Sequence, residues 1–294
     1  MFNHIVINNN QTYISKLLEE VKEYNQIKKT ILVDNNQLLL YLIYSSLNFK
    51  FWIDKNNYWS FQNISGASGL FKAVDTMIKN EKNYFDFFNK LTYKEFNDFL
   101  SFNGSEKLPY MKIRFQYVKE IIELLRDSFN QNIENLISYN NYDAVKIVQY
   151  LSDNTKAFSD SIEFNEKKIY LVKKATFFIK LLIQTKNYND NLTNIDKLQI
   201  LSDYRVPQLL RHFKILEYSK ELSYMVDNQQ ILTEEYEKEI RMATIIFSKS
   251  LIDNKKTILN ILELDEYLWK KAKRLERSHS KSLKPFHLME STKY

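Results

Sequence analysis

The sequence of 294 residues contains only three glycines and three prolines. The tight turns of hairpins and barrels, and the loops that cradle phosphate, depend on glycine because they need backbone conformations that other residues avoid. So few glycines indicate few sharp turns and a mainly α-helical protein. Since 44% of the residues are hydrophobic, the chain can bury a large core.

The clearest helix is predicted over residues 110–129. Met111, Val118, Ile122 and Leu125 recur there at helical spacing, so they share one face. Less regular patterns predict further helices at residues 13–27, 131–152, 166–185, 207–224, 233–252 and 263–276. We therefore expect a compact multi-helix bundle.

Aromatic residues alternate with other residues at Phe49 and Phe51, and again at Trp59 and Phe61. A period of two is typical of a strand with one buried face. Two such runs close together favour a short β-hairpin near residues 49–61.

No repeat, linker or shift in composition divides the sequence. We expect a single globular domain over residues 1–294 that works as a monomer. Its N-terminal part, about residues 1–105, could form a subdomain packed on a helical part, about residues 106–294. No sequence feature marks a cut between them.

Composition argues against several kinds of site. The chain has no cysteine, which rules out disulfides, thiolate nucleophiles and cysteine-bound zinc. The four histidines show no metal-ligand spacing, so we expect no metal and no cofactor. The net charge of +6 arises from 42 bases interspersed with 36 acids, too weak an excess to indicate direct nucleic-acid binding. Without a secretory signal or a long apolar run, we expect a cytoplasmic protein with no membrane partner.

Residues 203–208 bring together an acid, a phenol, a guanidinium and an amide, which belong to Asp203, Tyr204, Arg205 and Gln208. Pro207 favours a helix start here, since its missing N–H costs nothing in a first turn. Asp203 then lies just before a helix N-terminus, where the helix dipole favours a charged carboxylate. Two interpretations stay open. Asp203 caps the helix, or it stabilises a positive charge that develops in a cleft.

Two lysines, Lys173 and Lys174, fall inside the helix predicted over residues 166–185, which is apolar on most sides. Such a helix is expected to be buried, and a buried ammonium group is costly without a partner. One lysine side chain can extend to solvent. The alternative is a lysine held near a carboxylate in a cleft.

Together these elements resemble the queuosine salvage family, the queuosine 5′-phosphate N-glycosylases. The family's F-A-D-Y-R-[VL]-P-Q signature is similar to residues 201–208, and its F-Y-K-R-A segment to residues 171–175. Its F-R-D element resembles residues 158–160, and its L-N-F-x-F-W element matches residues 47–52. Its P-[FY]-H element matches residues 285–287. These elements agree in order over almost the whole chain.

The family's E-I-R triplet also matches residues 239–241, but other positions depart from the family pattern. Both arginines of the family's H-R-T-R tail are absent from residues 287–294. The alanine before the signature aspartate is Ser202 here, and the arginine after the buried lysine is Lys174. An aspartate that commonly lies nine residues before the signature aspartate is Asn194. The chain is therefore similar to a divergent member.

The resemblance implies a fold like that of the helical DNA glycosylases. It implies hydrolysis of the N-glycosidic bond of queuosine 5′-monophosphate, which releases queuine for tRNA modification. Such a bond breaks through an oxocarbenium-like sugar. By resemblance, Asp203 stabilises that cation and activates the attacking water, while Lys173 anchors Asp203 or donates to the ribose or base.

The resemblance also suggests contacts to the base. Asp160 would accept hydrogen bonds from its guanine-like edge, since a carboxylate accepts from adjacent N–H donors. Phe49, Phe51 or Trp52 would stack on the base, or would simply pack in the core. Asn48 belongs to the same element and is a further candidate contact.

The 5′-phosphate needs cationic or N–H donors. Arg205 and His287 are the candidates, although Arg205 could instead form a structural ion pair with Asp203. Gln208 either reaches the ligand or caps its helix, and Tyr204 completes the candidate set.

Two other functions stay open. A DNA-type glycosylase grips a backbone phosphate with a glycine-rich hairpin, and none of the three glycines lies near residues 173–203. A protein that binds the nucleotide with weakened turnover would agree with the absent tail arginines, because a fold does not guarantee activity. Arg114 and Arg241 are expected in structural roles.

Overall fold

The computed structural model describes residues 2–22, 31–54, 57–103, 107–164, 167–254, 257, 259–278 and 283–294. Over these residues it contains thirteen α-helices and three two-stranded sheets. The expected mainly α-helical fold is confirmed. Within the same residues, a helix with the length and apolar character needed to span a membrane is not found.

The chain forms two compact units that interleave along the sequence. Unit 1 consists of Met1–Lys28, Ile162–Lys173 and Asp196–Glu290, and unit 2 consists of Lys29–Ser161, Lys174–Ile195 and Ser291–Tyr294. Each unit therefore draws on three separate stretches of sequence. The expected subdomain boundary near residue 105 stays a prediction.

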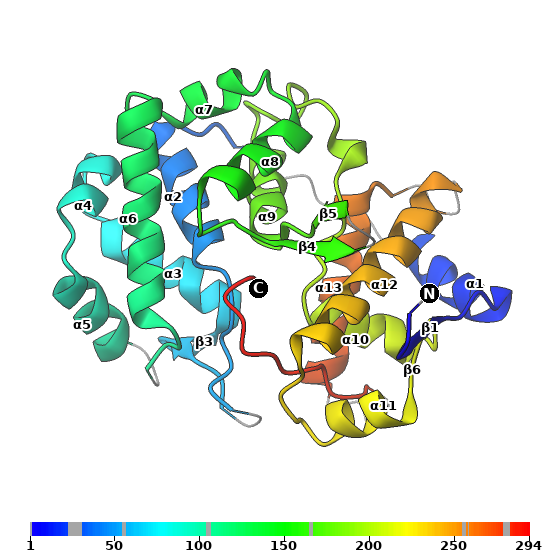
Figure 1. The fold of residues 1–294 in the computed structure, drawn as a ribbon. Helices are drawn as coiled ribbons and strands as arrows, with labels where there is room; N and C mark the ends of the chain where they lie inside the picture. The colour runs from blue at the N-terminus through cyan, green and yellow to red at the C-terminus, as the bar shows by residue number, and fades with distance from the viewer. Residues whose placement is uncertain are drawn as a thin grey trace. The chain divides into compact units, whose positions relative to one another are not determined.

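Unit 1 is mainly helical. The elements that lie wholly or mainly in it are β1 (Ile5–Ile7), α1 (Gln11–Lys22), β4 (Ser161–Phe164), β5 (Lys167–Tyr170), the 3-10 helix η1 (Ile195–Lys197), α10 (Arg205–His212), β6 (Leu216–Tyr218), α11 (Lys220–Asp227), α12 (Glu234–Asp253) and α13 (Ile261–Arg277). Helix α10 packs against both α12 and α13 (Figure 1). Strand β1 pairs with β6 in antiparallel register, with Ile5 opposite Tyr218.

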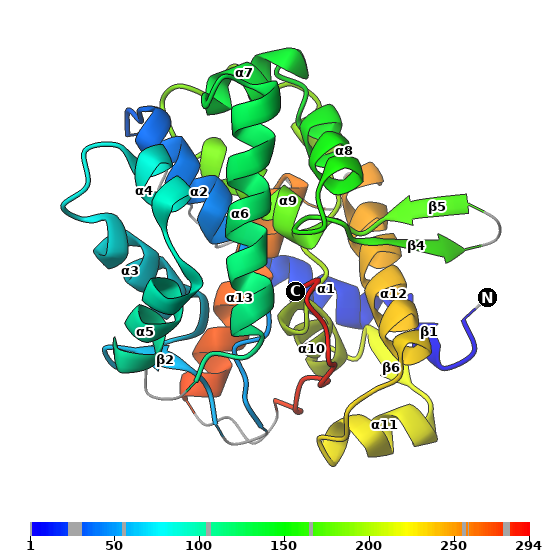
Figure 2. The same ribbon diagram turned by 60° about the vertical axis from the view of Figure 1, so that its left-hand side comes forward.

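Unit 2 holds the other helices. Its elements are α2 (Asn35–Ser46), β2 (Ser60–Phe61), β3 (Ile64–Ser65), α3 (Gly66–Ile78), α4 (Tyr84–Lys90), α5 (Tyr93–Asn103), α6 (Met111–Ser128), α7 (Ile133–Tyr139), α8 (Ala144–Asn154) and, after its first residue, α9 (Lys173–Leu182). The long helix α6 packs on α2, α4 and α5 (Figure 2). Because α6 carries one apolar stripe, its buried face forms much of the core of this unit.

Antiparallel pairing occurs where the hairpin was expected. Trp52 and Tyr58 form an isolated antiparallel bridge, and residues 55–56 lie outside the described residues. The strands proper follow directly, where β2 pairs with β3. Gln62 and Asn63 connect them with φ angles of 48° and 65°, as a two-residue turn with both φ values positive requires.

The predicted helix over residues 131–152 is wrong in its middle. Asn141 and Tyr142 both have φ near 55°, which ends α7 and separates it from α8. Asp143 then starts α8, because its carboxylate accepts the backbone N–H of Val145. The sequence pattern is periodic on both sides of this break, which is why it predicts one helix instead of two.

Two other predicted helices contain strands. Within residues 166–185, strand β5 precedes α9, and within residues 207–224 strand β6 separates α10 from α11. A positive φ of 58° at Lys214 turns the chain out of α10. The helices predicted over residues 110–129, 233–252 and 263–276 are confirmed as α6, α12 and α13.

Candidate active site

The segment around Asp203 starts a helix as expected. Helix α10 begins at Arg205, with Pro207 in its first turn. The Asp203 oxygen Oδ1 accepts the backbone N–H of Arg205 at 2.7 Å. Asp203 is 8% exposed, and its second oxygen, Oδ2, accepts no hydrogen bond from any residue that the structure describes. The carboxylate therefore binds the first backbone N–H of α10 with one oxygen and keeps the other available.

Arg205 is buried and bound to other residues of unit 1. Its Nη2 forms an ion pair with Glu276 Oε1 at 2.7 Å, and its Nη1 donates to Gln208 Oε1 at 3.1 Å. Burial alone raises the pKa of Glu276, but the charges of Arg205 and Lys273 outweigh it and lower that pKa. The guanidinium pairs with Glu276, whereas Asp203 contacts Arg205 through the backbone N–H.

Residues 284–287 lie against the start of α10. Gln208 Nε2 donates to the backbone oxygen of Lys284 at 2.8 Å. The rings of Tyr204 and Phe286 lie 4.6 Å apart, and the Arg205 guanidinium lies 4.6 Å from the Phe286 ring. The predicted residues Tyr204, Arg205 and Gln208 are therefore brought together around this segment.

His287 follows directly and is buried, with 2% of its surface exposed. Burial, helped by the positive charge of Arg241, lowers the pKa of His287 to about 3. The imidazole is therefore uncharged at neutral pH. It can offer an N–H to an anion but not a positive charge.

Helix α9 begins with the two lysines that the sequence singled out. Lys173 is 6% exposed and Lys174 is 2% exposed, so neither side chain extends into solvent. Val172 before them has a φ of 38°, a conformation that is rare for a β-branched residue. Lys173 belongs to unit 1, as does Asp203, whereas Lys174 belongs to unit 2.

Lys174 is held by groups of unit 2. Its Nζ donates to the backbone oxygen of Thr292 at 2.8 Å. It also lies over the rings of Phe49, at 4.7 Å, and Tyr117, at 4.6 Å. Carbonyl oxygens and ring faces therefore replace water around this ammonium group.

The predicted base-binding residues all belong to unit 2 and are buried. Asn48, Phe51 and Trp52 are each 4% exposed, whereas Phe49 and Asp160 are each 1% exposed. Asp160 lies in the connection between α8 and β4. Their roles in binding a base stay predictions.

Arg114 organises the segment that carries these aromatic residues. It is fully buried on α6, and its Nη2 donates to the backbone oxygens of Phe49, at 2.5 Å, and Lys50, at 2.9 Å. Its Nη1 donates to the backbone oxygen of Leu47, and its Nε to that of Pro109 at 2.8 Å. Only a weak signal for this role is present in the sequence, where Arg114 falls on the apolar stripe of its helix.

The chain is similar to known proteins over most of its length. A family model described as "Queuosine salvage protein" matches residues 32–294. The chain belongs to the queuosine salvage protein family. Similar proteins include the queuosine 5′-phosphate N-glycosylase/hydrolase of Dictyostelium discoideum, 30% identical over 78% of this chain and 70% of that protein. The proteins of the same name from Mus musculus and Nematostella vectensis are 23% and 22% identical, over 82% and 80% of this chain and 77% and 76% of their own lengths.

The motifs of the queuosine salvage family are divided between the two units. The signature residues that follow Ser202 and the segment at residues 285–287 belong to unit 1. The aromatic element at residues 47–52 and the element at residues 158–160 belong to unit 2. Each unit therefore contributes its own set of family residues.

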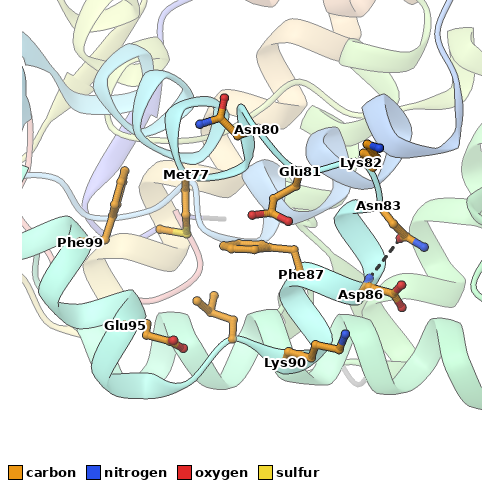
Figure 3. Close-up of a pocket in the computed structure, with 11 residues that line it drawn as sticks. Met77, Asn80, Glu81, Lys82, Asn83, Asp86, Phe87, Lys90, Glu95 and Phe99 are labelled. Carbon is orange, nitrogen blue, oxygen red and sulfur yellow. Dashed lines mark hydrogen bonds between the residues drawn. The ribbon is translucent and has the colours of Figure 1, made fainter.

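Two cavities among the described residues contain none of the predicted site residues. One, of about 450 Å³, lies in unit 1 and is lined by residues such as Phe2, Glu234 and Met242. The other, of about 710 Å³, lies in unit 2, and its lining mixes apolar side chains such as Phe87 with charged ones such as Lys90 (Figure 3). Over the same residues, no group of three acidic or histidine side chains is arranged to hold a metal ion.

Proposed function

We propose that this chain hydrolyses the N-glycosidic bond of queuosine 5′-monophosphate and releases queuine. Membership of the queuosine salvage family and the activity for which its relatives are named support the substrate. The observation that carries the reaction is the Asp203 carboxylate. One of its oxygens is fixed by the start of α10 and the other is available, in a position that is 8% exposed.

The reaction needs an anion beside the sugar. As the bond between C1′ and the base breaks, its electron pair leaves with the base and the ribose becomes positive. Asp203 stabilises that charge through Oδ2 and accepts a proton from the water that bonds to C1′. The products are ribose 5-phosphate and, after the base gains a proton, queuine.

The leaving group sets a further demand. The base has carbon at the position of guanine N7, so it cannot be protonated there. Its departure depends on hydrogen-bond donors elsewhere on the ring. Asp160 instead binds the base, since it accepts hydrogen bonds from the N–H groups of the guanine-like edge. Lys173 lies in the same unit as Asp203. Among the described residues the Asp203 carboxylate accepts only the Arg205 N–H, so we assign Lys173 to donating to the ribose or base.

We assign the 5′-phosphate to Arg205 and His287. Arg205 keeps its charge while it is paired with Glu276, and it supplies the planar donors that phosphate accepts. His287 supplies a neutral N–H, because its pKa lies near 3. The substrate is a free nucleotide, so this proposal needs no nucleic-acid partner.

The test is a product assay on purified protein with queuosine 5′-monophosphate and, in parallel, with queuosine. Asp203→Asn should lower kcat by about 10²- to 10⁴-fold, the usual contribution of a general base. The control is Asp196→Asn, an exposed acid in η1 of the same unit, which should leave the rate unchanged. Tight binding without product would show a binding protein, and an unchanged rate in Asp203→Asn would remove that residue from the mechanism.

A further inference from the structure

Helix α12 carries polar side chains along a face that is fully buried. Glu237, Arg241, Thr244 and Ser248 recur at helical spacing, and each is at most 1% exposed. A buried helix face is normally apolar, and a buried guanidinium is costly unless its donors are satisfied. The hydrogen-bond partners of Arg241 therefore indicate the role of this buried polar face.

Arg241 binds the residue that precedes Asp203. Its Nε donates to the backbone oxygen of Ser202 at 2.9 Å, and Ser202 Oγ donates back to the backbone oxygen of Arg241 at 3.1 Å. Its Nη1 pairs with Glu237 Oε1 at 3.1 Å, where both side chains are almost inaccessible to water. Glu237, Arg241 and Ser202 thus form one connected buried group within unit 1.

This group fixes the peptide unit that leads into Asp203. The Ser202 carbonyl and the Asp203 N–H belong to the same planar peptide bond, so a bond to one orients the other. The Asp203 N–H donates in turn to the backbone oxygen of Leu201 at 2.8 Å. On the far side, the Arg205 N–H fixes Oδ1 of the carboxylate. Asp203 is therefore held at its backbone on one side and at its carboxylate on the other.

We propose that Arg241 is a positioning residue for Asp203, and that Glu237 is its charge partner. This inference rests on the proposed function, in which Asp203 touches the reacting sugar. Arg241 acts through the Ser202 carbonyl and sets the direction in which the carboxylate points. A displacement of about 1 Å at a reacting group can cost about 10²-fold in rate. The reaction therefore depends on Arg241 to keep the Asp203 carboxylate in place.

Lysine should not replace Arg241. The guanidinium holds two partners at once, because its planar fork presents Nε to a carbonyl and Nη1 to a carboxylate. An ammonium group is a point charge and does not reproduce that geometry. Arg241→Lys therefore keeps the charge beside Glu237 but is expected to release Ser202.

The experiment compares Arg241→Met and Arg241→Lys with wild type, using queuosine 5′-monophosphate. Both variants should lose about 10²-fold in kcat, while KM changes by less than about three-fold. The matched control is Arg211→Met. Arg211 lies on α10 in the same unit and pairs with Asp227 at 2.7 Å, so its loss should leave kcat within about three-fold of wild type.

A double mutant separates positioning from general damage to the fold. If Arg241 acts through Asp203, Asp203→Asn combined with Arg241→Lys should be no slower than Asp203→Asn alone. A further, multiplicative loss in the double mutant would overturn the proposal, as would a kcat within about three-fold of wild type in Arg241→Lys. If Arg241→Met does not fold, Arg241→Lys carries the same comparison.

A crystal structure of Arg241→Lys tests positioning without turnover. The hydrogen bond from the Arg205 N–H to Asp203 Oδ1, 2.7 Å long here, should lengthen or break as residue 203 turns. An unmoved carboxylate would contradict the proposal. A wild-type protein that forms no queuine would instead contradict the proposed function, so the two failures are distinct.

Discussion

Two segments that carry family residues are each organised by a fully buried arginine, but the two arginines are compensated differently. In unit 1, Arg241 binds the Ser202 carbonyl and the carboxylate of Glu237. In unit 2, Arg114 binds four backbone carbonyls, and none of its partners among the described residues is a carboxylate. Burial without a counter-charge lowers the pKa of Arg114 to about 9.

The difference indicates two ways to fix a binding segment. A carboxylate partner such as Glu237 neutralises the guanidinium and leaves one carbonyl bond to orient a single peptide. Carbonyl dipoles alone leave a positive centre, which also lies 3.9 Å from the Phe49 ring. Unit 1 thus holds an anionic residue, Asp203, in one direction, whereas unit 2 shapes a longer stretch of backbone around a cation.

The largest expected effect comes from removing the carbonyl-bound arginine. Arg114→Met leaves the backbone oxygens of Phe49, Lys50 and Pro109 without this donor, and each unsatisfied acceptor costs about 1–3 kcal/mol. The free energy of unfolding should fall by at least about 3 kcal/mol. Urea unfolding followed by tryptophan fluorescence measures it, since Trp52 and Trp59 lie in this region.

Arg126→Met is the control, because Arg126 lies on the same helix and its side chain is 47% exposed. Its effect should stay within about 0.5 kcal/mol. Equal effects for the two variants would mean that the carbonyl contacts of Arg114 contribute nothing particular to unit 2.

A smaller effect is expected in how the stability of unit 1 depends on pH. The three histidines that the structure describes, His4, His212 and His287, lie in unit 1. Because the folded pKa of His287 is about 3, against an ordinary 6.5, the unfolded chain binds more protons between these values. Stability should therefore fall as the pH drops below 6.5. At pH 5 this one group should cost about 2 kcal/mol relative to pH 7.

His287→Asn should flatten that part of the curve. Urea unfolding of wild type and variant at pH 7 and pH 5 provides the measurement. Hydrogen exchange at pH 5 should locate the added opening in unit 1. An identical pH dependence in both proteins would show that His287 is protonated as easily in the folded chain as in the unfolded one.

The smallest effect is expected from Ser202→Ala, which restores the residue of the family pattern. The hydroxyl bond to the Arg241 backbone oxygen is lost, but the guanidinium still holds the Ser202 carbonyl. Stability should fall by about 1 kcal/mol and kcat should change by less than about two-fold. A large loss of kcat would show that the hydroxyl, rather than the guanidinium, orients Asp203.

The sequence predicted the regular helices well and the interruptions poorly. The apolar stripe of α6 predicted its bounds to within one residue at each end. The breaks depend on single backbone conformations, such as the positive φ at Tyr142 and Lys214, which residues of these types seldom adopt. Strand β6 forms because β1, about 200 residues earlier, pairs with it, and no local pattern carries that information.

For the site, the sequence predicted local features and missed distant partners. Asp203 before a helix start followed from Pro207 and the apolar residues after it. The pairing of Arg205 with Glu276 and of Arg241 with Ser202 joins residues far apart in the chain. Such pairs depend on how α10, α12 and α13 pack. The sequence alone indicates that a buried arginine needs a partner, but it does not identify the partner.

The most direct test of the central claim is a crystal structure of Asp203→Asn with queuosine 5′-monophosphate bound. The variant preserves the shape of the side chain while slowing its chemistry. The residue 203 side chain should lie within about 3–4 Å of C1′, or hold a water at about that distance from it. A bound nucleotide whose C1′ lies far from residue 203 would contradict the account.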